Sequence, residues 1–494
     1  MKIKTIPEGL TFDDVLLVPS YSDIKFGDPI STRALLCRGS GRSKDIYINA
    51  PFISATMDTV TMKEMAIALA RLGSGGSIQR KLTIEEQVIE VEHVKRHQSN
   101  MVTNPYTLNK NQTVKDALKL YQQHGFGTFP VVENGKLLGL ITGSRINNYS
   151  DEPKKKVSKI MVPFDKLSIV YTGASFEEAK RLMKKYDIEK IPVVKSKSDA
   201  TLIGLYFKKD IENISRYPNM SMDSKGRLLA IAGIGVGDDG FNRAVELVKA
   251  GVDVLCIDVA HGDHIDVIEI LKKLKKRFPN VPIIAGNVVT SKGALRLIKA
   301  GANALKVGIG PGAICTTRKV TGNGVPQITA IQEVYLVAKK YGIPIISDGG
   351  IKETGDVPKA FIAGADTVMM GSVFAGTDEA PGEIFVDEDG QRYKKYRGMG
   401  SKTAMDEGKG ISTDRYFKDK ATKDKVPEGI DGKVPYKGPV EKIFYEYLGA
   451  LKQSMAYQGA RNLDQLRKNG KFVRQTNFGL IESGTRVQKL NKFS

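Results

Sequence analysis

The sequence has few cysteines and no long apolar run. Its 494 residues include only Cys37, Cys256 and Cys315, which lie far apart and without metal-ligand spacing. A disulfide framework and a zinc site are therefore not indicated, and each cysteine has to be interpreted singly. No apolar run reaches the roughly 18 residues that a membrane span needs, and the first 20 residues contain no apolar signal segment. We therefore expect a cytoplasmic protein without membrane contact.

The charge is strongly basic but is not gathered in one place. The formal net charge is +20, and the lysines and arginines are spread along the whole chain among the acidic residues. Because a nucleic-acid site usually concentrates its basic residues, this distribution favours a solvated basic surface that attracts small anions such as nucleotides. A nucleic-acid partner is the less favoured interpretation.

Length and composition indicate a soluble α/β protein with two domains. The chain is too long for one ordinary domain, but it can hold one barrel of roughly 250 to 350 residues and a smaller module. Hydrophobic residues make up 41% of the chain, charged residues 26%, and there are 50 glycines, which is typical of a globular fold with many tight turns.

An internal repeat marks the smaller module. The segments "TVKDALKLYQQHGFGTFPVV" and "SFEEAKRLMKKYDIEKIPVV" have Ala117 and Ala179, and Pro130 and Pro192, at equal offsets. "LLGLI" or "LIGLY" follows each. Each copy is predicted to form an amphipathic helix and two short strands, too small to bury its apolar face alone, so we expect the copies to pack together.

The repeat resembles a tandem CBS module, the type named after cystathionine β-synthase. The resemblance places the copies at about 101–150 and 157–212, within a regulatory domain at 96–216. It implies that the cleft between the copies binds an adenine or guanine nucleotide. A purely structural insert is the alternative.

The remaining segments, 1–95 and 217–494, predict a (β/α)₈ TIM barrel into which the CBS domain is inserted. Short apolar runs recur with helical patterns between them, and their ends are followed by glycine-rich loops. This pattern is typical of parallel strands joined by right-handed crossovers, with the active face at the loops after the strands. The eight expected strands are 52–55, 75–78, 228–233, 254–258, 282–286, 304–308, 344–348 and 367–371.

A second fold remains open at one motif. Gly235, Gly237 and Gly240 have the G-x-G-x-x-G spacing of a dinucleotide-binding Rossmann fold, and Asp258 ends the next strand as that motif requires. The barrel is favoured because it uses all the strand and glycine-loop units. On either fold, the Asp258 carboxylate can accept hydrogen bonds from ribose hydroxyls.

Cys315 is the candidate nucleophile. It lies in the glycine-rich segment "LKVGIGPGAICTTRKVTGNGVPQ" after the sixth expected strand. A reactive thiolate needs an exposed position with amides or cations nearby, and glycines let a ligand approach the backbone. Cys256, inside "VLCID", is expected to be a buried small apolar residue, and Cys37 has no supporting motif.

Two segments after the last two strands predict a phosphate site, where barrels usually place one. "SDGGI" contains Asp348, whose carboxylate can accept both hydroxyls of a ribose, and "MMGSVFAG" offers bare amides to phosphate oxygens. "YRGMGS" follows as a third glycine-rich segment. Turn formation alone would explain any one of them, but not all three in barrel order.

The chain resembles the IMP dehydrogenase/GMP reductase family, and within it the dehydrogenases. The similarity extends from "LTFDDVLLVPSYSDI" through "ATMDTVT", "AGNVVT" and "SDGGI" to "STDRYF" and "EGIDGKVPYKG". The resemblance implies that Cys315 is the nucleophile and that Thr317, Arg415, Tyr416 and Glu428 serve hydrolysis. The implied substrate-binding residues are Met57, Asp348, Gly349, Gly350, Gly371, Ser372, Tyr396, Gly398, Met399, Gly400 and Glu428.

The resemblance also implies cofactors and an assembly. Asp258, Asn287, Gly308 and Gly310 would face NAD, and the carbonyls of Gly310, Gly312 and Cys315 would bind K⁺. Glu482, Ser483 and Gly484 of a neighbouring subunit would complete the K⁺ site of a homotetramer. The implied reaction is the NAD-dependent oxidation of IMP to XMP, the committed step of guanine nucleotide synthesis, through a cysteine thioimidate that a mobile flap at about 401–438 then helps to hydrolyse.

The sequence departs from the family pattern at several positions. Ala313 replaces a serine that contacts phosphate, and Ser77 and Gln79 replace an aromatic residue and a histidine. Val259 stands where a hydroxyl residue is common, and His264 where serine is common. These changes bear on the phosphate contacts and on the NAD side of the site.

Alternatives remain for two segments and for the function. His261, Asp263 and His264 have ligand-type side chains, although a loop does not place them by helical periodicity. The basic segment 416–429 is interpreted as part of the solvated flap rather than as a nucleic-acid arm. The rival functions are a GMP reductase, which uses NADPH, and a non-enzymatic nucleotide-sensing or RNA-binding protein.

Overall fold

The fold consists of a closed barrel unit and a smaller inserted unit. The computed structural model describes residues 6–97, 105–124, 127–174, 176–208, 216–388, 390–407 and 426–484. Arg415 and Tyr416, and with them residues 408–425 of the expected flap, lie outside these residues. The barrel unit comprises Met1–Lys95, Asn219–Ser221 and Leu228–Ser494, and the inserted unit comprises Arg96–Pro218 and Met222–Arg227. Among the described residues, no helix combines the length and apolarity that a membrane span requires.

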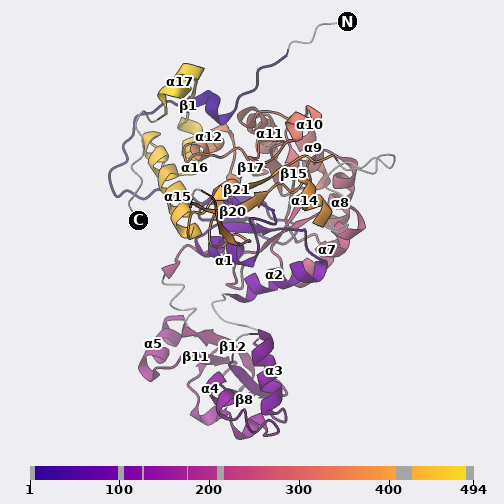
Figure 1. The fold of residues 1–494 in the computed structure, drawn as a ribbon. Coiled ribbons are helices and arrows are strands. Elements are labelled where there is room, and N and C mark those ends of the chain that lie inside the picture. The colour runs from indigo at the N-terminus through magenta and orange to yellow at the C-terminus, as the bar shows by residue number, and fades with distance from the viewer. Residues whose placement is uncertain are drawn as a thin grey trace. The chain divides into compact units, whose positions relative to one another are not determined.

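Eight parallel strands close the barrel, which confirms the expected fold and excludes the Rossmann alternative (Figure 1). The strand order is β13-β14-β15-β16-β17-β18-β4-β5. The barrel closes where Ser77 and Ile78 of β5 pair with Ile231 and Ala232 of β13. The strands are β4 Phe52–Ser54, β5 Gly75–Ile78, β13 Ile231–Ile234, β14 Val254–Asp258, β15 Ile283–Val288, β16 Ala304–Val307, β17 Ile345–Asp348 and β18 Thr367–Met370.

Helices surround the barrel, as Figure 1 shows for α7, α8, α9, α11 and α12. α9 has ordinary caps at both ends: the Thr290 side chain accepts from the Gly293 amide at its start, and Gly301, with φ +107°, ends it. The helices are α1 Lys63–Arg71, α2 Ile84–His97, α7 Gly237–Lys249, α8 Ile265–Arg277, α9 Ser291–Ala300, α10 Thr317–Thr321, α11 Gln327–Tyr341, α12 Asp356–Ala363, α13 Ser372–Ala375, α14 Lys402–Glu407, α15 Val440–Tyr457, α16 Leu463–Asn469 and α17 Asn477–Glu482.

Short strands outside the barrel tie distant parts of the chain together. β1 Val15–Leu17 pairs with β22 Phe472–Arg474, and β2 Ala34–Cys37 pairs with β3 Ile46–Ile48. A three-stranded antiparallel sheet comprises β19 Ile384–Val386, β20 Arg392–Arg397 and β21 Asp431–Pro435. This three-stranded sheet follows β18 in the chain, and its strand β20 contains Tyr396.

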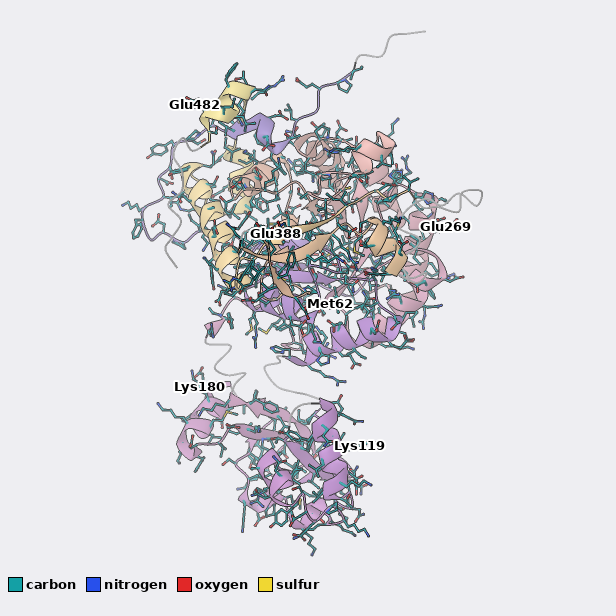
Figure 2. All side chains as sticks on the ribbon, in the orientation of Figure 1. Met62, Lys119, Lys180, Glu269, Glu388 and Glu482 are labelled. Carbon is teal, nitrogen blue, oxygen red and sulfur yellow. The ribbon has the colours of Figure 1, made fainter. Side chains whose placement is uncertain are left out.

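The barrel strands are buried along their whole length except at Asp348, the last residue of β17, yet several of their side chains are polar. All four residues of β16, including Lys306, and all five of β14, including Asp258, are buried. Around the outside, charged side chains point to solvent, as Figure 2 shows for Glu269 on α8 and Glu388 near β19. Buried charges need partners, so the interior polar residues are candidates for function.

The inserted unit contains the two predicted helix–strand–strand repeats. The first has α3 Val114–His124, β7 Phe129–Glu133 and β8 Lys136–Ile141, and the second has α5 Phe176–Tyr186, β11 Lys190–Val194 and β12 Leu202–Phe207. The described part also contains β6 Leu108–Asn109, α4 Gly143–Asn148, β9 Val162–Pro163, β10 Val170–Tyr171 and the 3-10 helices η2 Val157–Lys159 and η3 Phe164–Lys166.

Each repeat has its own apolar core, and the two repeats contact each other. Ala117 belongs to one core and Ala179 to the other, and both are fully buried, as their equal offsets predict. The Leu137 amide donates to Ala200 at 2.9 Å, and the Leu202 amide donates to Gly135 at 3.0 Å. The copies therefore contact each other as expected, but each buries its own apolar core rather than sharing one, and their nucleotide ligand stays a prediction.

Candidate active site

Loops at the carboxyl ends of the barrel strands enclose a cleft of about 130 Å³. This is the end of a (β/α)₈ barrel at which active sites lie. The cleft brings together residues from five strand ends and from the sheet that follows β18. Its lining comprises Met57, Val259, Ala260, Asn287, Gly308, Ile309, Gly310, Pro311, Gly312, Ile314, Cys315, Thr317, Asp348, Gly349, Tyr396, Gly398, Met399 and Glu428.

Cys315 lies at the cleft in the loop between β16 and α11. It is partly exposed, whereas the other two cysteines are buried. Its amide donates to the Gly312 carbonyl at 3.0 Å, which forms a turn, and its Sγ lies 3.2 Å from the Thr317 hydroxyl oxygen at the start of α10. An accessible thiol with an adjacent hydroxyl is suited to nucleophilic attack coupled to proton movement.

The last part of the expected flap is joined to the cysteine loop by backbone hydrogen bonds. The Thr316 amide donates to the Glu428 carbonyl at 3.1 Å, and the Ile430 amide donates to the Ile314 carbonyl at 3.0 Å. Glu428 in turn donates its amide to Gly400 at 3.0 Å. Glu428, Gly398 and Met399 are thereby held at the cleft beside Cys315.

Tyr396 and Met57 form the wall next to the expected phosphate loop. The Tyr396 hydroxyl lies 3.9 Å from the Met57 sulfur, and a Cβ added at Gly371 would lie 2.6 Å from that hydroxyl. A side chain at position 371 would therefore displace Tyr396. Burial raises the pKa of Tyr396, and the nearby Asp348 and Cys315 add to this effect. Tyr396 consequently keeps its proton and can donate a hydrogen bond to a ligand.

Lys306 connects the predicted substrate and cofactor residues from inside the barrel. Its Nζ lies 2.9 Å from Asp258 Oδ1 and 2.9 Å from Asp348 Oδ2, and it also donates to the Asn287 side-chain oxygen. The Asn287 amide nitrogen donates to Asp348 Oδ2 at 2.8 Å and to the Gly308 carbonyl at 2.7 Å. Asp348 still lines the cleft, with 20% of its side chain exposed, so it remains available to ribose hydroxyls.

Asp258 is buried in this structure, and its predicted place on the NAD side stays a prediction. Its side chain is only 2% exposed, it pairs with Lys306, and it does not line the cleft. The physical reason is the buried ammonium group, which requires a counter-charge and recruits the nearest carboxylates. Asn287, Gly308 and Gly310, the other residues predicted on the NAD side, do line the cleft.

The other predicted residues that the structure describes do not line the cleft. Gly350 packs near Phe12, Gly371 and Ser372 begin α13, and Gly400 accepts the Glu428 amide. Arg415 and Tyr416 lie outside the described residues. The last predicted group, Glu482, Ser483 and Gly484, lies at the end of α17 and does not line the cleft of its own chain.

The departures from the family pattern have distinct structural places. Val259 lines the cleft, and Ala313 is exposed in the cysteine loop. Ser77 and Gln79 are buried, with Ser77 accepting from the Thr56 hydroxyl at 2.8 Å. His264 caps α8 by accepting the Asp266 amide. Asp263, left open as a metal ligand, instead forms a two-contact ion pair with Arg296, and this pair lowers its pKa.

Sequence reasoning missed Lys306 and Gln327. The buried Gln327 donates to the Val307 carbonyl at 2.9 Å and to the Ser347 hydroxyl at 3.1 Å, so it joins the ends of β16 and β17 below the cysteine loop. The available signal was a lysine inside the apolar strand "ALKVG", because a charge in a fully buried strand requires partners.

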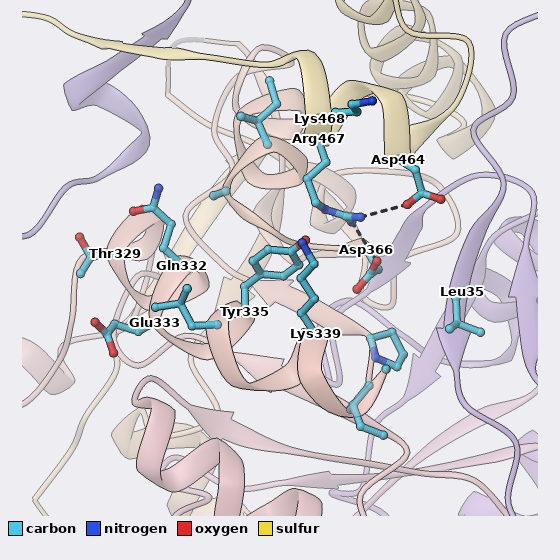
Figure 3. Close-up of a pocket in the computed structure, with 16 residues that line it drawn as sticks. Leu35, Thr329, Gln332, Glu333, Tyr335, Lys339, Asp366, Asp464, Arg467 and Lys468 are labelled. Atoms are coloured by element: carbon cyan, nitrogen blue, oxygen red, sulfur yellow. Dashed lines mark hydrogen bonds and ion pairs between the residues drawn. The ribbon is translucent and has the colours of Figure 1, made fainter.

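A larger groove of about 980 Å³ lies at a different part of the barrel unit (Figure 3). It is lined by residues of α11, α12 and α16, and by Pro344 and Asp366, which precede β17 and β18. Arg467 occupies it, pairing with Asp366 at 2.9 Å and Asp464 at 3.2 Å. These charges are matched within the chain, and the groove lies at the amino ends of the strands. The smaller cleft is therefore the candidate site.

These features define a (β/α)₈-barrel enzyme with a partly exposed cysteine at a cleft formed by the loops after its strands. Residues 9–486 match the family model described as IMP dehydrogenase / GMP reductase domain. The chain belongs to this family.

The proteins that are similar to this chain include both dehydrogenases and a reductase of the family. The chain is 46% identical over 482 residues to the inosine-5'-monophosphate dehydrogenase of Aquifex aeolicus (strain VF5), covering 97% of this chain and 96% of the relative. It is 44% identical over 490 residues to that of Bacillus subtilis (strain 168), covering 99% and 97%. A solved GMP reductase of Trypanosoma brucei in complex with guanosine 5'-monophosphate matches with TM-score 0.86 and 38% identity, covering 98% of this chain and 99% of the reductase.

Proposed function

We propose that the protein oxidises IMP to XMP with NAD as the hydride acceptor. The placement of the Cys315 sulfur 3.2 Å from the Thr317 hydroxyl, in a cleft with Asp348 and Tyr396, carries this proposal. The identity of 44–46% over nearly the whole chain to several dehydrogenases supports it. The activity accounts for the cysteine, the ribose-binding carboxylate and the phosphate loop together.

The first chemical step forms a bond to Cys315. The thiolate attacks purine carbon 2 of IMP, and the hydrogen on that carbon leaves with its electron pair to the nicotinamide ring. The product is a thioimidate between Cys315 and the nucleotide. Asp348 would hold the ribose, Tyr396 would donate to the ligand, and the Gly371 and Ser372 amides would receive the phosphate.

The second step is hydrolysis of the thioimidate. Water adds to carbon 2, the bond to Cys315 breaks, and the thiol and XMP are released. Arg415, with Tyr416, is the proposed base on a flap that enters after NADH leaves. A general base must be unprotonated, which for arginine requires a special environment. Thr317 and Glu428, both at the cleft, provide the second proton route.

The cleft fits part of the implied cofactor set. NAD supplies the hydride acceptor, and Asn287, Gly308 and Gly310 would face it; Asp258 could join them only by turning away from Lys306. For K⁺ we propose the carbonyls of Gly310, Gly312 and Cys315, with Glu482, Ser483 and Gly484 of a neighbouring subunit in a homotetramer. The Gly312 carbonyl already accepts the Cys315 amide, so it would offer K⁺ its second lone pair.

We also propose a purine nucleotide as the ligand of the inserted CBS-like repeats. A GMP reductase of Trypanosoma brucei solved in complex with guanosine 5'-triphosphate matches 96% of this chain and 99% of its own length, with TM-score 0.76. A nucleotide in the cleft between the two repeats would make the inserted unit regulatory.

GMP reduction is the second candidate function. The reductase of Trypanosoma brucei is covered over 99% of its length, so an inserted unit does not distinguish reductases from dehydrogenases. The Arg415–Tyr416 pair and the long flap favour the dehydrogenase, because only the oxidation ends in hydrolysis.

The deciding experiment measures both reactions on one preparation. IMP with NAD should produce NADH absorbance and XMP, and GMP with NADPH should give no consumption of NADPH. Turnover only with GMP and NADPH would assign the reductase. Turnover in neither assay, combined with salt-sensitive binding of RNA, would favour the non-enzymatic alternative.

A further inference from the structure

A half-buried lysine lies behind the predicted phosphate loop. Lys437 is in the connection between β21 and α15, and its Nζ donates to the carbonyls of Ser372 and Val373, each at 2.9 Å. Its backbone amide donates to the Gly376 carbonyl at 2.8 Å. A segment far along the chain therefore holds the single turn of α13 through both its side chain and its backbone.

These contacts lie on the carboxyl-terminal side of α13. In a helix the carbonyls point toward the carboxyl end and the amides toward the amino end, so a cation on the carbonyls complements the dipole of the turn. Each peptide unit carries its carbonyl and its amide in opposite directions. Fixing the Ser372 carbonyl on Lys437 therefore fixes the Val373 amide to point toward Gly371, the start of the turn.

The amino-terminal end of the same turn faces the cleft wall. Gly371 precedes α13, and a Cβ added there would lie 2.6 Å from the Tyr396 hydroxyl and 3.4 Å from the Met57 sulfur. One short turn thus has the predicted nucleotide site at its amino end and a lysine ammonium at its carboxyl end. A four-residue helix has only a small dipole of its own, so the added charge is a large part of the local field.

A second lysine in the same region makes a useful contrast. Lys394 on β20 donates to the carbonyls of Thr377 and Ala380, at 3.0 and 2.5 Å, and is only 2% exposed. Its contacts follow α13 in the chain and do not include the residues of the turn itself. Lys394 therefore supports the loop after the turn, whereas Lys437 acts on the turn.

We propose that Lys437 is a positioning residue for the nucleotide phosphate: it orients the first amides of α13 and adds a positive charge behind them. This inference rests on the proposed function, because it requires a phosphorylated nucleotide at the cleft. It adds to the phosphate site a residue that need not touch the ligand. Burial lowers the pKa of Lys437, and the carboxylate of Glu446 counteracts this effect.

The test compares ligands that differ only in the phosphate. Binding of IMP, GMP, inosine and guanosine to the full chain would be measured by calorimetry, without turnover. Lys437→Met should weaken both monophosphates about tenfold, because the charge behind the first amides of α13 and the hold on their orientation are both lost, and leave both nucleosides unchanged. Lys437→Arg keeps the charge and the hydrogen-bond donors, so it should lose less monophosphate affinity than Lys437→Met.

Matched controls separate positioning from folding. Lys442→Met removes an equal charge from an exposed position on α15 and should leave all four affinities unchanged. Lys394→Met should lower the melting temperature without a selective loss of monophosphates. Lys437→Gln keeps one donor without the charge and provides a second folded variant should Lys437→Met fail to fold; it should show the same selective loss.

The outcomes are distinguishable. Equal weakening of monophosphates and nucleosides would make Lys437 a structural residue, and unchanged monophosphate binding would also overturn the inference. A wild-type chain that binds neither monophosphate would contradict the proposed function, and with it the ligand that Lys437 is assigned to position.

Discussion

Cys315 and Cys256 place the same side chain in two different regions of the barrel. Cys315 is partly exposed in a glycine-rich loop at the rim, beside the Thr317 hydroxyl, and lines the cleft. Cys256 lies inside β14 with no exposed surface, and burial raises the pKa of its thiol to about 12. A substitution at the rim can therefore alter the reaction with little effect on folding. In the interior, buried side chains pack closely and some carry charge, so a substitution there affects the stability of the whole barrel.

The largest expected effect separates the two cysteines by activity. Cys315→Ala should abolish NADH formation from IMP, because no other thiol reaches the cleft among the residues described, and should change the free energy of unfolding by no more than about 0.5 kcal/mol. Cys256→Ala is the control and should retain activity while it lowers stability. Steady-state assays and urea titrations check both. An active Cys315→Ala enzyme would remove the basis of the comparison.

A second change tests the charge in the barrel interior. Lys306→Met leaves the buried carboxylate of Asp258 and the partly exposed carboxylate of Asp348 without their cation. Removing one partner of a buried ion pair typically costs about 3–5 kcal/mol. We expect the free energy of unfolding of the barrel unit, measured by urea titration, to fall by this amount. Lys299→Met, on the exposed face of α9, is the matched control. A loss below about 1 kcal/mol would mean that the carboxylates are not held as charged partners.

The smallest effect is a pH dependence. In the folded chain Cys256 stays a thiol up to a pKa of about 12, whereas in the unfolded chain it ionises near its ordinary value of 9.0. Unfolding therefore releases a proton between these values, and the free energy of unfolding should fall as pH rises through this window. Cys256→Ala should show a shallower fall, measured by denaturant titration from pH 8 to 11. Identical slopes in both proteins would contradict the burial of this thiol.

Much of the architecture could be predicted because it depends on local pattern. The eight strands were placed by apolar runs that end at glycine loops, and seven of the eight match the observed strands to within two residues at each end. The exception is the expected strand 228–233, which the structure has as Ile231–Ile234, because Leu228–Ala230 are buried before the strand begins. The cysteine loop and most of the substrate residues also lie at one cleft, as expected.

What could not be predicted depends on contacts between distant residues. Lys306 and Lys437 have nothing in their neighbouring sequence to show that their partners are Asp258 and Asp348, or the carbonyls of α13. The burial of Asp258 has the same origin, since its orientation is decided by a lysine on another strand. Short strands such as β6 and β10, with two residues each, have too little pattern to detect.

The strand order has a consequence for synthesis of the chain on the ribosome. β4 pairs with β18, which is made roughly 300 residues later; at about 5–20 residues per second this interval is roughly 15 to 60 seconds. The inserted unit is complete well before then, and its two cores use only its own residues. The inserted unit can thus fold before β4 has paired with β18 and β5 with β13. The unpaired edges of β4 and β5 are where a chaperone would be needed most.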